Sequence, residues 1–211
     1  MRMLMIAVAL LMTGCASAVY DSLDRRGVDS VDVLKERAGT LRAELRDAET
    51  SMIKAADALA AVDGLDGAAL ARRLDLARSE GQSAALAAQD MRLAADSMMA
   101  ASERYFADKE RELSLMKTDD AAYRASADRL AASGVAYRAF LTATDAASLR
   151  LSPALSLYDA EVVALRKAPT SGAAVAARAS SRASTVTAAR EAAQSLNAAG
   201  AEGDRFLAAL N

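Results

Sequence analysis

The chain has 211 residues, of which 53% are hydrophobic but only 4% aromatic, so most of the hydrophobic count is small side chains, mainly alanine. Small side chains bury little apolar area, which argues against a compact globule with a dense core. The 26 basic and 28 acidic residues nearly cancel, which argues against nucleic-acid binding and against an acidic disordered tail.

The same composition favours helices. Alanine is the best helix former, and two prolines and ten glycines leave few breaks. Such a chain is typical of long helices or coiled coils. The length allows one or two domains, and no linker indicates a second.

Residues 1–14 have the pattern of an export signal. Arg2 gives a positive start, an apolar run from Met3 to Met12 follows, and small residues precede Cys15. The apolar run is too short to cross a bilayer, which takes about 20 residues. We therefore expect residues 1–14 to be a signal peptide.

Residues 11–15, LMTGC, resemble the lipobox of bacterial lipoproteins, although the usual leucine lies one place early. The resemblance implies that Cys15 becomes the acylated first residue of the mature chain. The alternatives are a buried thiol or an incidental cysteine beside an ordinary signal. A free thiol is reactive in an oxidising compartment, whereas several acyl chains give a stable anchor.

Ala16 rather than aspartate follows the cysteine, and resemblance to the lipoprotein sorting rule then implies the outer membrane. We expect Cys15 to be the lipidation site, residues 15–29 a lipidated tether, and residues 30–211 a helical bundle domain. The expected location is the periplasmic face of the outer membrane.

A heptad pattern begins after the tether. Asp29 and Ser30 are suitable N-caps for a first helix. Ten consecutive core positions then follow a 3,4 spacing, well beyond what a coiled coil requires: Val31, Leu34, Ala38, Leu41, Leu45, Ala48, Met52, Ala55, Leu59 and Val62. The turn residues VDGLDG, 62–67, end this helix.

A second helix is predicted from about Asp66 to Met116. Its heptad core positions, which we call the seam of the helix, are mostly small residues, so a neighbouring helix can approach closely. The seam is Leu70, Leu74, Ala77, Gly81, Ala84, Ala88, Met91, Ala95, Met98, Ser102 and Tyr105. Thr118, Asp119 and Asp120 then form an acidic cap for a third helix.

The third seam continues through a proline. It comprises Tyr123, Ala127, Leu130, Gly134, Tyr137, Leu141, Thr144, Ser148, Leu151, Leu155, Tyr158, Val162 and Leu165. Pro153 disfavours a helix interior, yet the heptad register is the same on both sides of it. We favour one kinked helix; the alternative is a second helix that begins at Pro153.

The residues APTSG, 168–172, predict a turn, with Thr170 or Ser171 as the cap of a last helix. The seam of this helix is Val175, Ala179, Arg182, Val186, Ala189, Ala193, Leu196, Gly200, Gly203, Leu207 and Leu210. Because it contains a charge and two glycines, we expect fraying toward the C-terminus.

Short turns make consecutive helices antiparallel, so the predicted fold is all-α: an elongated antiparallel bundle or coiled coil of three to four long helices.

The sequence offers no familiar catalytic arrangement. It contains no histidine, so Ser-His-Asp, Cys-His and histidine-ligated metal sites are excluded. Glu103, Asp108, Glu110 and Glu112 could attract a divalent cation, but a solvated face fits better, in which Asp108 pairs with Arg111 at helical spacing and Lys109 and Arg111 offset much of the charge. We expect no catalytic residue, metal or cofactor.

Four tyrosines raise the possibility of a recognition stripe: Tyr105, Tyr123, Tyr137 and Tyr158. Three of them lie on one seam, so we favour a role in the core, where an aromatic ring fills volume that alanine leaves open.

The order of several segments resembles an uncharacterised family of bacterial lipoproteins with a domain of unknown function. These segments are YDSLDRRGVDSVDVLKERAGTLRAELRDA, ERYFADKEREL and LSPALSLYDAEVVALRK, and the resemblance covers about residues 19–210. Lys109 replaces a tryptophan of that family, and many larger apolar positions are alanine here. The resemblance implies class and location but no catalytic residue.

Together these features predict a non-enzymatic lipoprotein of the cell envelope that acts as a scaffold or protein-interaction rod. The expected partners are the membrane, through the lipid anchor, and an envelope protein or a second copy of the chain, but no nucleic acid. The alternative is a carrier or chaperone that holds a lipid or an unfolded client between its helices.

Overall fold

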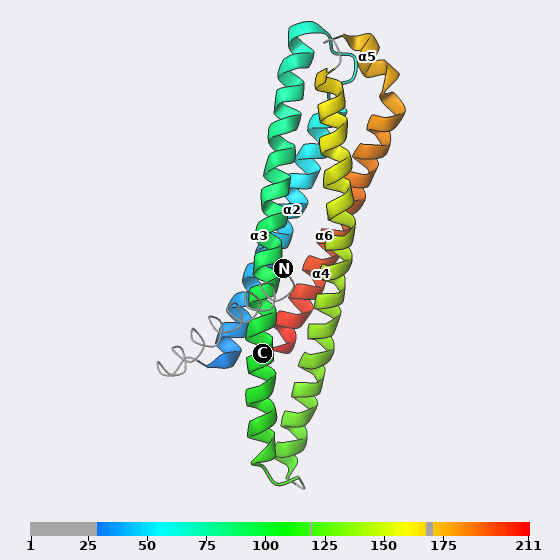
Figure 1. Cartoon of the computed structure of the whole chain (residues 1–211). Coiled ribbons are helices and arrows are strands. Elements are labelled where there is room, and N and C mark those ends of the chain that lie inside the picture. Colours follow the sequence, from blue (N-terminus) through cyan, green and yellow to red (C-terminus); the bar gives the residue numbers. More distant parts are fainter. Residues whose placement is uncertain (1–28, 119, 168–170) are drawn as a thin grey trace, which may run out of the picture.

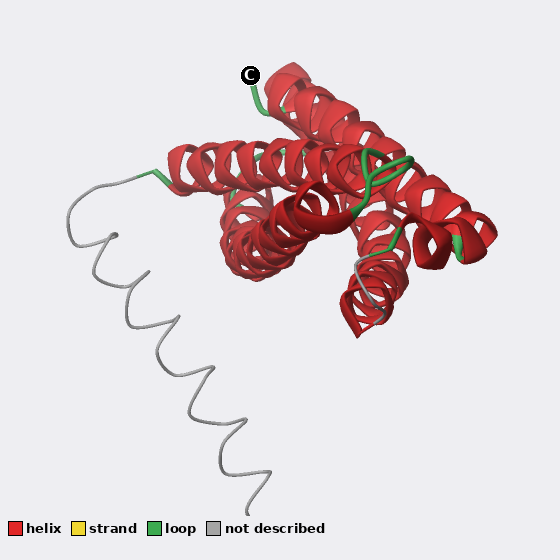
Figure 2. Ribbon diagram, turned by 90° about the horizontal axis from the view of Figure 1, so that it is seen from above, coloured by secondary structure: helices red, strands yellow, loops and turns green. Residues whose placement is uncertain are grey.

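The computed structural model of the protein describes residues 29–118, 120–167 and 171–211. Over these residues the chain forms five α-helices (Figures 1 and 2): α2 (Ser30–Ala60), α3 (Gly67–Ser114), α4 (Ala121–Lys167), α5 (Gly172–Ala177) and α6 (Ala179–Ala209). The predicted all-α antiparallel bundle is confirmed. The predicted signal peptide, Cys15 and the tether as far as residue 28 lie outside the described residues.

The four long helices surround a common core. α2 packs against α3 and α6, and α4 packs against the same two helices from the other side. With 48 and 47 residues, α3 and α4 are each about 70 Å long, whereas α2 and α6 have 31 residues each. The excess length of α3 and α4 forms a two-helix projection that ends in the turn between them (Figure 1).

The predicted heptad positions form the core. Leu34, Leu41, Leu45, Met52 and Leu59 of α2 are all completely buried. The alanines between them are buried too, so the neighbouring helices approach α2 closely. The 3,4 spacing therefore reports the interior face of this helix correctly.

Aspartates cap three of the helices by accepting from amides one or two residues further on. Asp29 Oδ1 lies 3.0 Å from the amide nitrogen of Val31, and Asp66 Oδ1 lies 2.8 Å from that of Gly67. At the start of α4, Asp120 accepts from Ala122 at 2.9 Å. Each cap satisfies an amide that has no partner within its helix.

Pro153 lies inside α4, so the expectation of one helix through this position is confirmed. Proline has no amide hydrogen, and the carbonyl of Leu149 therefore loses its usual helical donor. Both residues are exposed, which leaves that carbonyl open to water. An exposed position is where a helix tolerates this loss best.

The last predicted helix is divided at Arg178, whose backbone φ and ψ of −106° and 10° interrupt the helix between α5 and α6. Ser171 occupies the N-cap position of α5 but makes no side-chain capping bond; Thr170 lies outside the described residues. The break places Arg178 against Glu161 of α4. A single unbroken helix was therefore the wrong expectation.

The expected fraying of the C-terminal helix is also wrong. α6 continues to Ala209, and Phe206 is completely buried. A Cβ atom at Gly203 would lie 2.9 Å from Cζ of Phe140, so this glycine is a notch for an aromatic ring. The glycine that predicted a weak helix end therefore lies where α6 packs closely against α4.

Across the described ranges, no helix is both long and apolar enough to cross a membrane.

Two glycines of α6 provide a matched test of the notch. We expect Gly203→Ala to lower the free energy of unfolding by about 1–3 kcal/mol, because the added methyl group overlaps Phe140. Gly200→Ala meets nothing within 4 Å, so it should stabilise the helix by about 0.5–1 kcal/mol. Urea unfolding followed by circular dichroism measures both, and equal effects of the two substitutions would contradict the notch.

Candidate functional site

The predicted lipidation site, Cys15, lies outside the described residues. Its assignment therefore continues to rest on the sequence pattern. The described residues contain a second candidate site, a groove between α3 and α4, and several polar and aromatic clusters that bear on the other predicted candidates.

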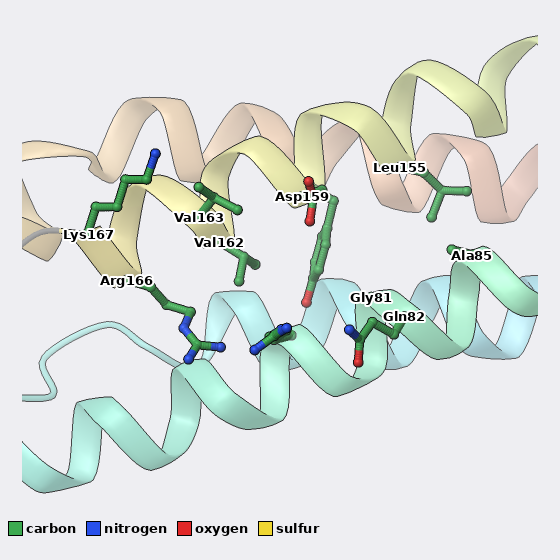
Figure 3. A pocket seen from close by; sticks show the side chains of 11 residues that line it. Gly81, Gln82, Ala85, Leu155, Asp159, Val162, Val163, Arg166 and Lys167 are labelled. Atoms are coloured by element: carbon green, nitrogen blue, oxygen red, sulfur yellow. The ribbon is translucent and has the colours of Figure 1, made fainter.

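The groove has a volume of about 460 Å³ and runs along the α3–α4 interface (Figure 3). Its residues come from both helices: Arg78, Gly81, Gln82 and Ala85 from α3, and Leu155, Tyr158, Asp159, Val162, Val163, Arg166 and Lys167 from α4. The volume lies within the range of small-molecule sites in proteins.

Charge and apolar surface occupy opposite ends of this groove. Arg166 and Lys167 lie at one end, whereas Leu155 and Ala85 lie at the other (Figure 3). Arg78 lies toward the cationic end, because α3 and α4 are antiparallel and Arg78 precedes Ala85 by about two turns. The groove is thus polarised along its length.

Only part of this positive charge is neutralised by neighbours. Arg166 pairs with Asp75 of α3 at 3.3 Å. Within the described part of the chain, Arg78 and Lys167 make no ion pair. Counting Asp75 and Asp159, three cations face two carboxylates, and the groove keeps a net positive charge.

The inner wall of the groove is the ring of Tyr158. Its hydroxyl donates toward two backbone carbonyls, those of Ala55 at 3.0 Å and Ala77 at 2.8 Å, and so links α4 to both α2 and α3. A Cβ atom at Gly81 would lie 2.5 Å from this ring. Burial, with a smaller contribution from the charge of Glu80, raises the pKa of Tyr158, which keeps the hydroxyl protonated as a donor.

Glu161 is a buried carboxylate with complete hydrogen bonding. It is only 2% exposed and accepts from Arg178 at 3.0 and 2.6 Å and from Ser181 at 2.7 Å. Burial by itself would raise the pKa of this carboxyl, but the hydrogen bonds from Arg178 and Ser181 lower it below the ordinary value. This group ties α4 to the start of α6.

Arg182, which made the predicted last seam look weak, is a structural residue. It is 3% exposed, donates to the carbonyl of Val175 at 2.9 Å and pairs with Asp63 in the α2–α3 turn. Asp66 of the same turn accepts from the amide of Gly172 at 3.2 Å. The buried charge of Arg182 therefore stabilises this end of the bundle.

The tyrosines do not form a surface stripe. Tyr105 and Tyr158 are buried, while Tyr123 and Tyr137 are half-buried. Tyr137 shares a 2.6 Å hydrogen bond with Ser102 and stacks at an angle on Phe106 and Phe206, with ring centroids 5.4 and 5.6 Å apart. The prediction that these rings fill the core is correct for Tyr105 and Tyr158 and partly so for the other two.

Two carboxylates of the acidic cluster of α3, Asp108 and Glu112, form ion pairs at helical spacing. Asp108 pairs at 3.7 Å with Arg104, one turn before it in the helix, and not with the expected partner Arg111. Lys109 contacts Glu112 at 2.9 Å, and this hydrogen bond raises the pKa of the lysine. Over the described residues, no group of three His, Cys, Asp or Glu side chains could hold a metal ion.

Sequence reasoning missed the cationic end of the groove. Arg78 and Arg166 lie at exposed heptad positions of separate helices, where a single sequence shows only a solvated surface. The available signal was the combination of Gly81 and Tyr158 at predicted interior positions, because a glycine on one helix can accommodate a ring from another.

The family described as "Protein of unknown function (DUF2959)" matches residues 19–210 of the chain. The expected resemblance to a family of unknown function is thereby confirmed over the expected span. No curated protein and no solved structure matches the chain.

The Glu161 network predicts a pH-dependent stability. The folded-state pKa of the Glu161 carboxyl is below the ordinary value of 4.5. Its ionised form therefore stabilises the folded protein above that pH, and this stabilisation is lost as the pH falls through the folded-state pKa. We expect the gap in free energy of unfolding between wild type and Glu161→Gln to narrow from about pH 6 to about pH 3. Urea titrations at each pH measure it.

Glu110→Gln, at an exposed site on α3, is the matched control. The difference in free energy of unfolding between this variant and wild type should change less over the same pH range. If the difference in free energy of unfolding between Glu161→Gln and wild type stays constant with pH, the buried carboxylate is not the source of the pH-dependent stability.

Proposed function

The chain belongs to this family of proteins of unknown function, and on that premise we propose that it is a non-enzymatic lipoprotein of the outer membrane. In this proposal Cys15 carries the lipid anchor and the helical bundle extends into the periplasm. The bundle acts there as a scaffold or protein-interaction rod.

Apolar rows on the outer faces of α3 and α4 carry the interaction part of the proposal. Leu86 and Leu93 are 63% and 60% exposed and lie one heptad apart on α3. On α4, Val135 and Leu149 are 61% and 77% exposed and lie two heptads apart. We call these four residues the outer rows.

Single exposed apolar residues are common on protein surfaces and need no explanation. The outer rows differ because their members recur at one heptad position on each helix, away from the core. Recurrence at one heptad position keeps apolar residues on one face of a helix, where a further helix could pack. It supports a helical partner, either an envelope protein or a second copy of the chain.

The anchor and the location rest on the sequence. The short apolar run, the small residues before Cys15 and the acylation chemistry of such a motif all support export and lipidation. A lipid anchor would hold the bundle at the membrane while leaving the outer rows free to meet a partner.

The alternative function, a carrier or chaperone, requires space between the helices. In the described core, the seams of α2 with α3 and α6 are filled by buried side chains such as Leu41, Leu45 and Leu59. The observation that favours a carrier is instead the surface groove between α3 and α4.

Replacement of the cysteine tests the anchor. We expect Cys15→Ser to abolish incorporation of labelled palmitate and to leave an unprocessed precursor, because no thiol remains to be acylated. Globomycin, which blocks the lipoprotein signal peptidase, should give the same precursor from wild type. Ser17→Ala, two residues away, should be labelled and processed normally. Normal cleavage and membrane retention of Cys15→Ser would refute the anchor.

Site-specific photo-crosslinking in intact cells tests the outer rows. A photoreactive residue at Leu93 or Leu149 should give an adduct of one discrete mass, because both positions face the proposed partner. The same residue at Lys54, exposed on α2, is the control and should not give that adduct. Replacing Leu86 with glutamine should weaken the Leu93 adduct. Equal adducts at all three positions would contradict a specific interface.

A further inference from the structure

We propose that the groove between α3 and α4 binds a fatty acid, a single acyl chain that ends in a carboxylate. The proposal goes beyond the scaffold role and does not depend on it. It assigns the acyl chain to the apolar end of the groove and the carboxylate to the cationic end.

The apolar end matches an acyl chain. Ala85 of α3 and Leu155 of α4 present only hydrocarbon at this end, and Tyr158 adds the face of its ring. Val162 and Val163 continue the apolar wall toward the cationic end, while Gln82 and Asp159 line the groove between the two ends (Figure 3). From Leu155 to Lys167 the wall extends about 18 Å at 1.5 Å per residue. Each methylene group buried there contributes about 0.8 kcal/mol, so the chain supplies most of the affinity.

The cationic end matches a carboxylate. Arg78 approaches from α3 and Arg166 from α4, so an anion between the helices meets donors from both sides, and Lys167 adds a further positive charge at the same end. An arginine guanidinium binds a carboxylate through two parallel hydrogen bonds. Arg78 and Lys167 make no ion pair with other described residues and would supply the new contacts, whereas Arg166 is partly engaged by Asp75.

The groove is preformed. Tyr158 is fixed by its two hydrogen bonds, at 3.0 and 2.8 Å, and by the close approach of Gly81. The wall against which the acyl chain would lie is therefore rigid before the ligand arrives, and binding costs little reorganisation.

The separation of charge and apolar surface distinguishes this ligand from others. A peptide needs hydrogen-bonding partners for its backbone along its whole length, whereas Gln82 and Asp159 are the only described residues lining the groove outside its cationic end whose side chains offer them. A small inorganic anion would use the cationic end and leave the apolar end unused. Only an amphiphile with one anionic end uses both halves of the groove (Figure 3).

Photolabelling of the full-length protein, purified in a non-ionic detergent, tests the proposal. The probe is dodecanoate with a diazirine on its chain, and peptide mapping locates the adducts. We expect adducts on residues 78–85 of α3 or residues 155–167 of α4. Unlabelled dodecanoate should compete, whereas acetate, which has only the head, should not.

Matched variants test the two ends separately. The double substitution Arg78→Gln with Lys167→Gln should reduce labelling at least fivefold, and Arg46→Gln with Lys54→Gln, at exposed positions of α2, should leave it unchanged. Ala85→Phe, at an exposed position, should obstruct the apolar end and reduce labelling similarly. Circular dichroism establishes that each variant is folded.

Three results would overturn the proposal. Labelling concentrated outside the groove would refute the site. Equal labelling by a neutral dodecanol probe, unaffected by loss of Arg78 and Lys167, would refute recognition of the carboxylate. Competition by acetate as strong as by dodecanoate would reduce the groove to a simple anion site. None of these results bears on lipidation of Cys15 or on the outer rows, so the scaffold role stands or fails separately.

Discussion

Two aromatic side chains of α4 lie in notches that glycines leave in the neighbouring helices, and the arrangement of the bundle depends on them. The ring of Tyr158 occupies the space beside Gly81 of α3, and the ring of Phe140 occupies the space beside Gly203 of α6. In an alanine-rich core the helices lie close together, and at these two positions a ring fits because the facing residue is glycine. The two notches therefore fix the register of α4 against both of its neighbours.

Polar contacts close the end of the bundle at which the α2–α3 turn meets α5. Arg182 of α6 reaches Asp63 in that turn, and Glu161 of α4 is held by Arg178 at the α5–α6 break. Buried charges are costly unless they are paired and hydrogen-bonded. Because each of these has its partner on a different element, the charges join three parts of the chain where small apolar residues provide little cohesion.

Much of the fold could be predicted from the sequence, because a heptad pattern directly reports the interior face of a helix. The seams of α2 and α3 and the continuation of α4 through Pro153 follow from that periodicity alone. The break at Arg178 could not be predicted, since its partner Glu161 lies on another helix. Gly203 was misread for the same reason: a glycine on a seam weakens an isolated helix but accommodates a ring in a packed one.

The sequence by itself determined the helical class, the turns, the interior face of each helix and the motif at Cys15, because each depends on residues close together in the chain. The tertiary structure decided which helices are neighbours, and it brought Arg78 of α3 beside Arg166 of α4. Both arginines read as ordinary surface charges until the two helices are placed side by side. The groove exists only between helices, so its charge and its shape are properties of the packing.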